Sequence, residues 1–193
     1  NVGDRVKGEI EWEKRMALMR HHTATHILLG ALRHALGEHV WQHGVQKGEE
    51  SSRLDVSHFK RITDEELQEV EKLANRVVLE NRDVKSLWMK RNEAEGKYGH
   101  SLYQGGVVPG KEIRVIDIDD WNAQACAGTH CTRTGEVGLI KIVGRERVQD
   151  GVERLIFAAG ESLLEKIQER EQKVKKASEV LRSEPDKIDS AVQ

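Results

Sequence analysis

The pattern of hydrophobic and polar positions divides the chain into strand-like and helical stretches. In residues 1–12, Val6 and Ile10 alternate with charged neighbours, which is typical of a short strand. Residues 14–36 instead have helical spacing, and Gly37 provides a stop signal. The residues that share one face of this helix are Leu18, His22, Thr25, His26, Leu29 and Leu36. We therefore expect a helix whose chemically interesting side chains point the same way.

A second helix follows a pair of strands. Residues 41–58 contain the strand-like segments 45–48 and 52–56. Thr63 and Glu66 then have the spacing of a capping box, and the stripe of apolar residues after them predicts an amphipathic helix that ends near Asn81. That stripe consists of Leu67, Val70, Leu73, Ala74, Val77 and Val78.

The remainder of the body is predicted to be rich in strands. Residues 84–89 and 113–118 are strand-like and are separated by a glycine-rich loop, 96–110. Residues 139–143 and 152–158 read as further strands, and the pair Asp150-Gly151 is typical of the tight turn of a hairpin that begins near Arg145.

From Gly160 the composition changes to a narrow apolar seam among charged residues. The seam predicts a long helix that packs against one partner helix, from this chain or from a second copy, and Glu184-Pro185 ends it. The whole pattern predicts an α+β fold, with long helices on a mostly antiparallel sheet and a C-terminal helical arm. The seam residues are Leu163, Leu164, Ile167, Val174, Ala177 and Leu181.

Composition narrows the class of protein. The chain has 193 residues, 37% of them hydrophobic, and a net charge of -2, so it can form a core but has no overall positive field. Its two cysteines, Cys126 and Cys131, lie close together, which disfavours a secreted disulfide framework and favours a cytoplasmic protein. No apolar run is long enough to cross a membrane. The first residue is Asn1 rather than methionine, so we expect a fragment of a longer protein.

Two separated pairs of residues have the chemistry of metal ligands. His22 and His26 are four residues apart and lie on one face of the predicted helix. Cys126 and His130 repeat this spacing with one thiol and one imidazole. Together they form a set of three nitrogens and one sulfur, which suits Zn²⁺. The sequence has no phosphate-binding loop or dinucleotide fingerprint, which disfavours a nucleotide-powered enzyme in this segment.

Several questions about this set stay open from the residues alone. Cys131 either replaces Cys126 as a ligand, is a spare thiol, or is a small buried residue. His21 points off the shared face, so we expect it to be exposed or to donate a hydrogen bond behind the ligands. Thr23 stands where a metalloprotease has its glutamate, which disfavours peptide hydrolysis. Four protein ligands also suit a structural zinc, whereas a catalytic zinc keeps one position open.

The order of the motifs resembles a known family. The motifs are His22-Thr23-Ala24-Thr25-His26, Gln46-Lys47-Gly48, Asp55-Val56-Ser57-His58 and Cys126-Ala127-Gly128-Thr129-His130 followed by Thr134, Gly135, Glu136 and Gly138. Over roughly residues 14–160 they are similar to the editing domain of alanyl-tRNA synthetase, to free-standing alanyl-tRNA editing proteins and, more distantly, to a domain of threonyl-tRNA synthetase. The stretch 103–110 is similar to archaeal members.

The resemblance implies a function, a substrate and a set of site residues. It implies hydrolysis of tRNA(Ala) wrongly charged with serine or glycine, with His22, His26, Cys126 and His130 holding Zn²⁺. It also implies that Thr25 recognises the serine hydroxyl and that Gln46 lies near the terminal adenosine and the scissile ester. From the residues alone, Thr25 is equally well explained as a helix hydroxyl bonded to a carbonyl four residues earlier.

The resemblance also divides the chain and suggests partners. Residues 1–13 would end a preceding β-rich region, 14–160 would form the editing domain, and 161–193 would begin a helical dimerisation region. The basic residues that could contact the acceptor stem and 3′ end of the tRNA are Lys47, Arg53, Lys60, Arg61, Lys141, Arg145 and Arg147. Two alternatives remain: a zinc-stabilised module that binds tRNA and dimerises without catalysis, and a threonyl-type editing domain.

Overall fold

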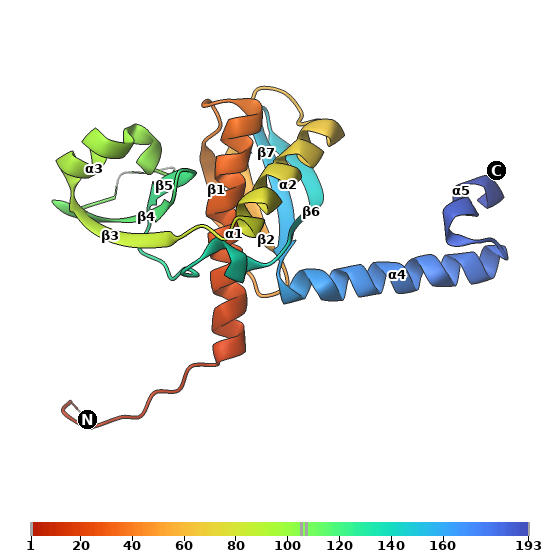
Figure 1. Ribbon diagram of the computed structural model, residues 1–193, viewed down its shortest axis with the longest axis horizontal. Coiled ribbons are helices and arrows are strands. Elements are labelled where there is room, and N and C mark those ends of the chain that lie inside the picture. Colours follow the sequence, from red (N-terminus) through yellow and green to blue (C-terminus); the bar gives the residue numbers. More distant parts are fainter. Residues whose placement is uncertain (1, 105, 107, 193) are drawn as a thin grey trace.

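A long central helix lies between two antiparallel sheets. The computed structural model describes residues 2–104, 106 and 108–192, and Asn1, Gly105, Val107 and Gln193 lie outside the described residues. Helix α1 (Trp12–Leu36) contacts strand β7 of one sheet and strand β5 of the other (Figure 1). The predicted α+β fold with antiparallel sheets is confirmed.

Helix α1 is buried on every side along its central turns. All residues from Thr23 to Arg33 are buried, so the prediction of one apolar face is too narrow. A helix that is apolar all round belongs in the middle of a protein, because each of its faces meets another element. Gly37 ends the helix as predicted: its φ is 115°, and its N–H donates to Arg33 O.

A four-stranded sheet covers one side of α1. Its strands, in spatial order, are β1 (Gln42–Gln46), β2 (Ser52–Ser57), β7 (Val152–Ala159) and β6 (Ile140–Gln149). The predicted β6–β7 hairpin is confirmed, and its turn contains Gly151 with φ of 77°. Helix α2 (Asp64–Leu79) packs against both α1 and β6.

The start of α2 is fixed by the capping box that the sequence predicts. Thr63 Oγ1 accepts from Glu66 N–H at 3.2 Å, and Glu66 Oε2 accepts from Thr63 N–H at 2.9 Å. These two bonds satisfy backbone N–H groups that the first turn of a helix otherwise leaves free. The helix ends at Leu79, close to the predicted end.

A three-stranded sheet covers the other side of α1. It consists of β3 (Val84–Lys90), β4 (Glu112–Ile118) and β5 (Asn122–Ala125). Helix α3 (Arg91–Tyr98) and the 3₁₀ turn η1 (His100–Leu102) close a second small core over this sheet. The predicted loop 96–110 is therefore partly helical, and neither α3 nor β5 was predicted. Gly105 and Val107 of the archaeal-type stretch are not among the described residues.

The two ends of the chain extend away from this body (Figure 1). Described residues 2–11 contain no strand and are exposed, so the predicted first strand is wrong; no neighbouring strand pairs with this segment. Helix α4 (Glu161–Leu181) is followed by the 3₁₀ turn η3 (Pro185–Lys187) and the short helix α5 (Ile188–Val192).

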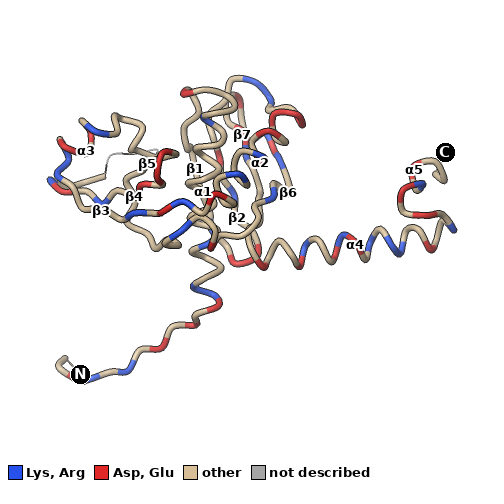
Figure 2. The backbone as a smooth tube through the Cα atoms, viewed as in Figure 1, with Lys and Arg blue, Asp and Glu red and all other residues tan. Residues whose placement is uncertain are grey.

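Helix α4 has few contacts with the body. Leu163 is its one buried residue among those described, and the seam residues Leu164 and Ile167 are exposed. Figure 2 shows both acidic and basic residues distributed along its whole length. No long helix of the described chain packs along the seam, so the predicted partner helix is not found within this part of the chain. Among the described residues, no helix combines the length and the apolar character needed to span a membrane.

Candidate metal centre

The two predicted ligand pairs meet at one point. His22 and His26 come from α1, whereas Cys126 and His130 come from the loop after β5, which the register of the three-stranded sheet brings beside that helix. Their four ligand atoms all lie within 4.8 Å of one another. Cys126 Sγ is 3.3 Å from His22 Nε2 and 3.5 Å from His130 Nε2. The fold thus brings together two ligand pairs that lie about a hundred residues apart in the sequence.

This arrangement fits a tetrahedral metal ion. Bonds of about 2.0–2.3 Å to zinc hold neighbouring ligand atoms roughly 3.3–3.6 Å apart, which matches the two sulfur–nitrogen distances. His26 supplies a further sign: its Nε2 is buried and has no hydrogen-bond partner among the described residues. A buried polar atom without a partner is rare, and a metal ion in the centre of the group would satisfy it. The group can therefore hold a metal ion.

The imidazoles are kept in the neutral form that binds metals. Burial lowers the pKa of His22 to about 3 and that of His130 to about 2. Burial also lowers the pKa of His26 far below its ordinary value, and the neighbouring histidines add to the effect. At neutral pH all three rings therefore keep a free nitrogen lone pair, which metal coordination requires.

Small residues around the group fix the rings in place. The buried Thr23 Oγ1 accepts from the backbone N–H of Cys131 at 3.0 Å and lies 3.4 Å from His130 Nδ1, which leaves Nε2 of that ring facing the group. Gly128 is required for space, because a Cβ there would lie 2.2 Å from Cε1 of His22. Such contacts behind the ligands set ring orientation. Thr23, which was considered only as a missing glutamate, thus supports a ligand.

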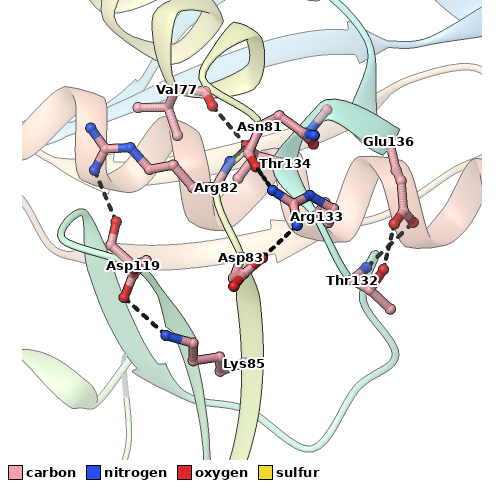
Figure 3. Close-up of polar contacts among 11 residues, drawn as sticks. Val77, Asn81, Arg82, Asp83, Lys85, Asp119, Thr132, Arg133, Thr134 and Glu136 are labelled. Atoms are coloured by element: carbon pink, nitrogen blue, oxygen red, sulfur yellow. Dashed lines mark hydrogen bonds and ion pairs between the residues drawn. The ribbon is translucent and has the colours of Figure 1, made fainter.

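The segment after the second ligand pair is tied to the junction of α2 and β3 (Figure 3). Thr134 Oγ1 donates to Val77 O at 2.7 Å and accepts from the Arg82 N–H at 2.8 Å. Arg133 forms an ion pair with Asp83 at 2.8 Å. A loop that is already restrained loses little conformational entropy when it binds a metal ion. These contacts therefore help to preorganise Cys126 and His130, the two ligands that the loop carries.

The remaining residues of this motif are also structural. Gly135 accommodates Asn81, because a Cβ at position 135 would lie 2.5 Å from Asn81 Oδ1. The same oxygen accepts from Gly135 N–H at 3.2 Å. Glu136 accepts from Thr132 N–H at 3.3 Å (Figure 3). The motif after His130 therefore shapes the loop rather than the ligand group.

Two of the open questions about neighbouring residues are now answered. Cys131 is 2% exposed and its sulfur is not part of the ligand group, so it is a small buried residue; burial raises the pKa of its thiol. His21 was predicted to be exposed or to support the ligands, and this is wrong. It is completely buried, its Nδ1 bonds to Ala17 O at 3.0 Å, and its ring packs near Phe157.

Thr25 and Gln46, the two residues expected to act on the substrate, lie in different environments. Thr25 is 2% exposed, and its hydroxyl donates to His21 O at 2.8 Å, which is the helix bond considered as the alternative explanation. Its oxygen keeps a free lone pair. Gln46 ends β1, is exposed, and lines a cavity of about 320 Å³ together with Lys47 and Arg53.

Two cations lie beside the ligand group. Lys47 is close enough that its charge lowers the pKa of His22, His26 and His130. Arg114 of β4 has a similar effect, and its guanidinium donates to the Gly128 carbonyl at 2.6 Å. Arg114 was not among the predicted residues, because one arginine in a strand carries no signal in the sequence.

The other predicted basic residues lie farther along the surface. Lys60, Lys141, Arg145 and Arg147 each form an ion pair with an acidic residue, and Arg61 is exposed. Arg53 differs from these, since its Nε is buried without a hydrogen-bond partner among the described residues. Within the predicted set, Lys47 is the residue whose charge reaches the ligand group, and Arg53 lines the same cavity as Lys47.

Comparison with known proteins identifies relatives of the chain. Residues 113–156 match the family described as the threonyl and alanyl tRNA synthetase second additional domain. The chain is also 56% identical over 191 residues to an alanine–tRNA ligase of Methanopyrus kandleri, a match that covers 99% of the chain and 21% of that protein. The resemblance to an alanyl-tRNA synthetase editing domain is confirmed.

Further relatives give the same result. An alanine–tRNA ligase of Thermococcus kodakarensis is 56% identical over 186 residues, which is 96% of the chain and 20% of the relative. One of Saccharolobus islandicus is 49% identical over 192 residues, which is 100% of the chain and 21% of the relative. The chain thus spans about a fifth of the length of these curated relatives.

Proposed function

We propose that the chain is the editing part of an alanine–tRNA ligase and hydrolyses the ester of tRNA(Ala) mischarged with serine or glycine. The observation that carries the proposal is the convergence of His22, His26, Cys126 and His130 on one point, within a chain similar to these ligases. The proposed metal is Zn²⁺, because a set of three imidazoles and one thiolate suits it. When bound, zinc would supply a Lewis acid at the ester.

The residues around the group give the site what ester hydrolysis needs. An aminoacyl ester is already activated, so positioning and charge stabilisation are the main requirements. The charges of Lys47 and Arg114 reach the ligand group and would stabilise the negative charge that develops on the ester oxygen. Gln46 lines the cavity next to Lys47, where we place the terminal adenosine. Thr25, whose hydroxyl hydrogen is already bonded, would accept a hydrogen bond from the substrate.

The RNA itself would be held by its phosphates. Lys47 and Arg53 line one cavity, and a phosphodiester is the anion that an RNA 3′ end would present to it. Lys60, Lys141, Arg145 and Arg147 would contribute weakly, since their charges are already paired with acids. We propose tRNA as the macromolecular partner on this basis, and a second copy of the chain as a further partner through α4.

One observation favours a second function. All four ligands come from the protein and lie within bonding reach of one ion, which is typical of a structural zinc. In that case the chain would be a zinc-stabilised module that binds tRNA without hydrolysing the ester. The alternative of a threonyl-type editing domain is tested by comparing hydrolysis of Ser-tRNA(Thr) with hydrolysis of Ser-tRNA(Ala).

Removal of zinc distinguishes a catalytic zinc from a structural zinc. We expect a chelator to abolish hydrolysis of Ser-tRNA(Ala) while circular dichroism keeps most of the folded signal, and added Zn²⁺ to restore activity. Loss of the folded signal on chelation, with no hydrolysis by the zinc-loaded chain, would support the structural role instead. Hydrolysis of Ser-tRNA(Thr) but not Ser-tRNA(Ala) would support the threonyl-type function.

A further inference from the structure

One polar group of the buried Gln124 side-chain amide has no hydrogen-bond partner among the described residues. Its side chain lies on β5 and is 1% exposed. Its Oε1 accepts a hydrogen bond from Gln104 Nε2, which orients the amide, but its own Nε2 has no partner among the described residues. A buried N–H group without an acceptor is costly, so native proteins rarely leave one unless a ligand or water completes it.

The position of Gln124 on β5 places this amide beside the ligand group. Side chains at alternate positions of a strand point to the same face, so Asn122, Gln124 and Cys126 share one face. The pairing continues through Cys126, whose N–H donates to Arg114 O at 3.0 Å. Two residues along a strand span about 7 Å, so Gln124 lies within this distance of both neighbours along the backbone.

Both neighbours of Gln124 on this face contact the centre. Asn122 Nδ2 donates to the backbone carbonyl of His26 at 2.9 Å, which fixes β5 against α1 at a ligand. Cys126 Sγ lies 3.3 Å from His22 Nε2. Gln124 is therefore bracketed by a contact to one ligand-bearing turn and by a ligand itself. Gln124 therefore lies on the face of β5 that meets α1, between these two contacts.

Among the described residues assigned to the site, Gln46 is also a neutral amide, but it is exposed and is assigned to the terminal adenosine, so it does not supply a buried donor. The Thr25 hydroxyl has already given its hydrogen to His21 O, so this side chain can only accept. Lys47 and Arg114 are cations, and they attract carboxylate, phosphate or a developing oxyanion rather than distinguish one small side chain from another. A serine hydroxyl needs an acceptor and a donor, and Gln124 supplies the donor that Thr25 cannot.

We propose that Gln124 Nε2 donates a hydrogen bond to the hydroxyl of the substrate's serine and is a specificity-determining residue of the site. This inference rests on the proposed function. Alanine has no hydroxyl and would leave the buried N–H unpaired, so the site would reject the correct amino acid although alanine is smaller than serine. Glycine also lacks the hydroxyl and leaves the same N–H unpaired, so Gln124 does not account for the proposed removal of glycine.

The test measures recognition apart from hydrolysis. The probes are RNA minihelices of the tRNA(Ala) acceptor stem that carry serine, alanine or glycine on the 3′ end through a stable amide, titrated into the zinc-loaded full chain by calorimetry. We expect the natural chain to bind the seryl probe at least ~10-fold more tightly than the alanyl probe. Gln124→Met, which keeps the size but removes the amide, should reduce this ratio to about 1 and leave the ratio of glycyl to alanyl binding unchanged.

A matched variant controls for the loss of a buried amide. Gln42 of β1 also has a buried amide atom, its oxygen, without a partner among the described residues, but it pairs with Val56 in the four-stranded sheet, whereas Gln124 belongs to the three-stranded sheet. Gln42→Met should keep the serine preference. If Gln124→Met does not fold, Gln124→Asn withdraws the donor by one methylene with less disturbance and should also lose the preference.

The outcomes distinguish this inference from the proposed function. A serine preference that survives in Gln124→Met or Gln124→Asn would overturn the role of Gln124, as would an equal loss of binding for all three probes, which would indicate a structural role or a bound water. If the preference depends on Gln124 but the natural chain does not hydrolyse Ser-tRNA(Ala), the recognition role stands and the proposed hydrolysis fails. If the natural chain has no serine preference, the role of Gln124 is overturned whether or not hydrolysis occurs.

Discussion

Gly128 lies so close to His22 that a Cβ at position 128 would be 2.2 Å from Cε1 of the imidazole. Real Cβ atoms do not approach another atom so closely, so any other residue here must displace the ring or the loop. This contact links the two ligand pairs directly, since Gly128 lies between Cys126 and His130. The geometry of the centre thus depends on the absence of one methyl group.

The first prediction follows from this contact. Gly128→Ala should turn the His22 ring away from the group and lower zinc affinity by roughly 10- to 100-fold, as measured by competition with a chromophoric chelator. Gly96→Ala is the matched control, because a Cβ at Gly96 of α3 meets nothing within 4 Å. Equal affinities in Gly128→Ala and Gly96→Ala would contradict the close packing described here.

Binding of tRNA should depend on salt through the two cations at the cavity. Each phosphate contact that is removed lowers the slope of log affinity against log salt by about 1. We expect Lys47→Ala and Arg53→Ala each to lower this slope, measured by filter binding across a range of KCl concentrations. Arg147→Ala is the control, because Arg147 is already paired with Asp150 at 3.0 Å. A larger change of this slope in the control than in the two cavity variants would indicate that the RNA binds another surface.

The Asp55–Arg154 pair makes the stability of the four-stranded sheet depend on pH. Arg154 Nε and a second guanidinium nitrogen donate to Asp55 at 2.7 and 2.9 Å, and this pairing lowers the pKa of the Asp55 carboxyl below 3.8. Because the unfolded carboxyl titrates at the higher pKa, the pair stabilises the fold above pH 3.8, and this contribution is lost as the pH falls through the folded pKa.

Asp55→Asn should therefore lower the free energy of unfolding by about 2 kcal/mol at pH 7, and its effect should vanish at low pH. Urea unfolding at pH 7, 4 and 3 checks both parts. Asp150→Asn, which removes an exposed carboxylate from the β6–β7 turn, serves as the comparison. The account is wrong if Asp55→Asn costs as much at pH 3 as at pH 7.

The C-terminal arm is predicted to mediate dimerisation. Its exposed seam includes Leu164, Ile167 and Val174, and Val180 is 82% exposed, so a second helix would bury these side chains. Sedimentation equilibrium of the full chain should give twice the monomer mass, and a chain truncated after Gly160 should be a monomer. An unchanged mass on truncation would place any dimer contact elsewhere.

The sequence predicted those parts of the fold that depend on local signals. The capping box at Thr63 and the tight turn at Gly151 are confirmed because each needs only a few neighbouring residues. Strand β5 and helix α3 were missed because they are short and lack clear periodicity. The strand expected in residues 1–12 is wrong because alternation alone does not supply a partner strand.

In the candidate site, too, local spacing could be predicted from the sequence, whereas contacts between distant segments could not. The four ligands are predicted by spacing within each pair, and the fold brings the pairs together. The burial of His21 could not be predicted, because the sequence does not reveal that α1 is enclosed on all sides. Arg114 and Gln124 were missed for a related reason: their importance comes from the register of β4 and β5, which places them beside Cys126.

The most direct test of the central claim is the rate at which the zinc-loaded chain deacylates Ser-tRNA(Ala) and Ala-tRNA(Ala), compared with Cys126→Ala. We predict that the natural chain removes serine much faster than alanine and that Cys126→Ala lowers the serine rate by roughly 100-fold or more while the circular dichroism spectrum is retained. Equal rates on the two substrates, or an unchanged serine rate in Cys126→Ala, would contradict the account.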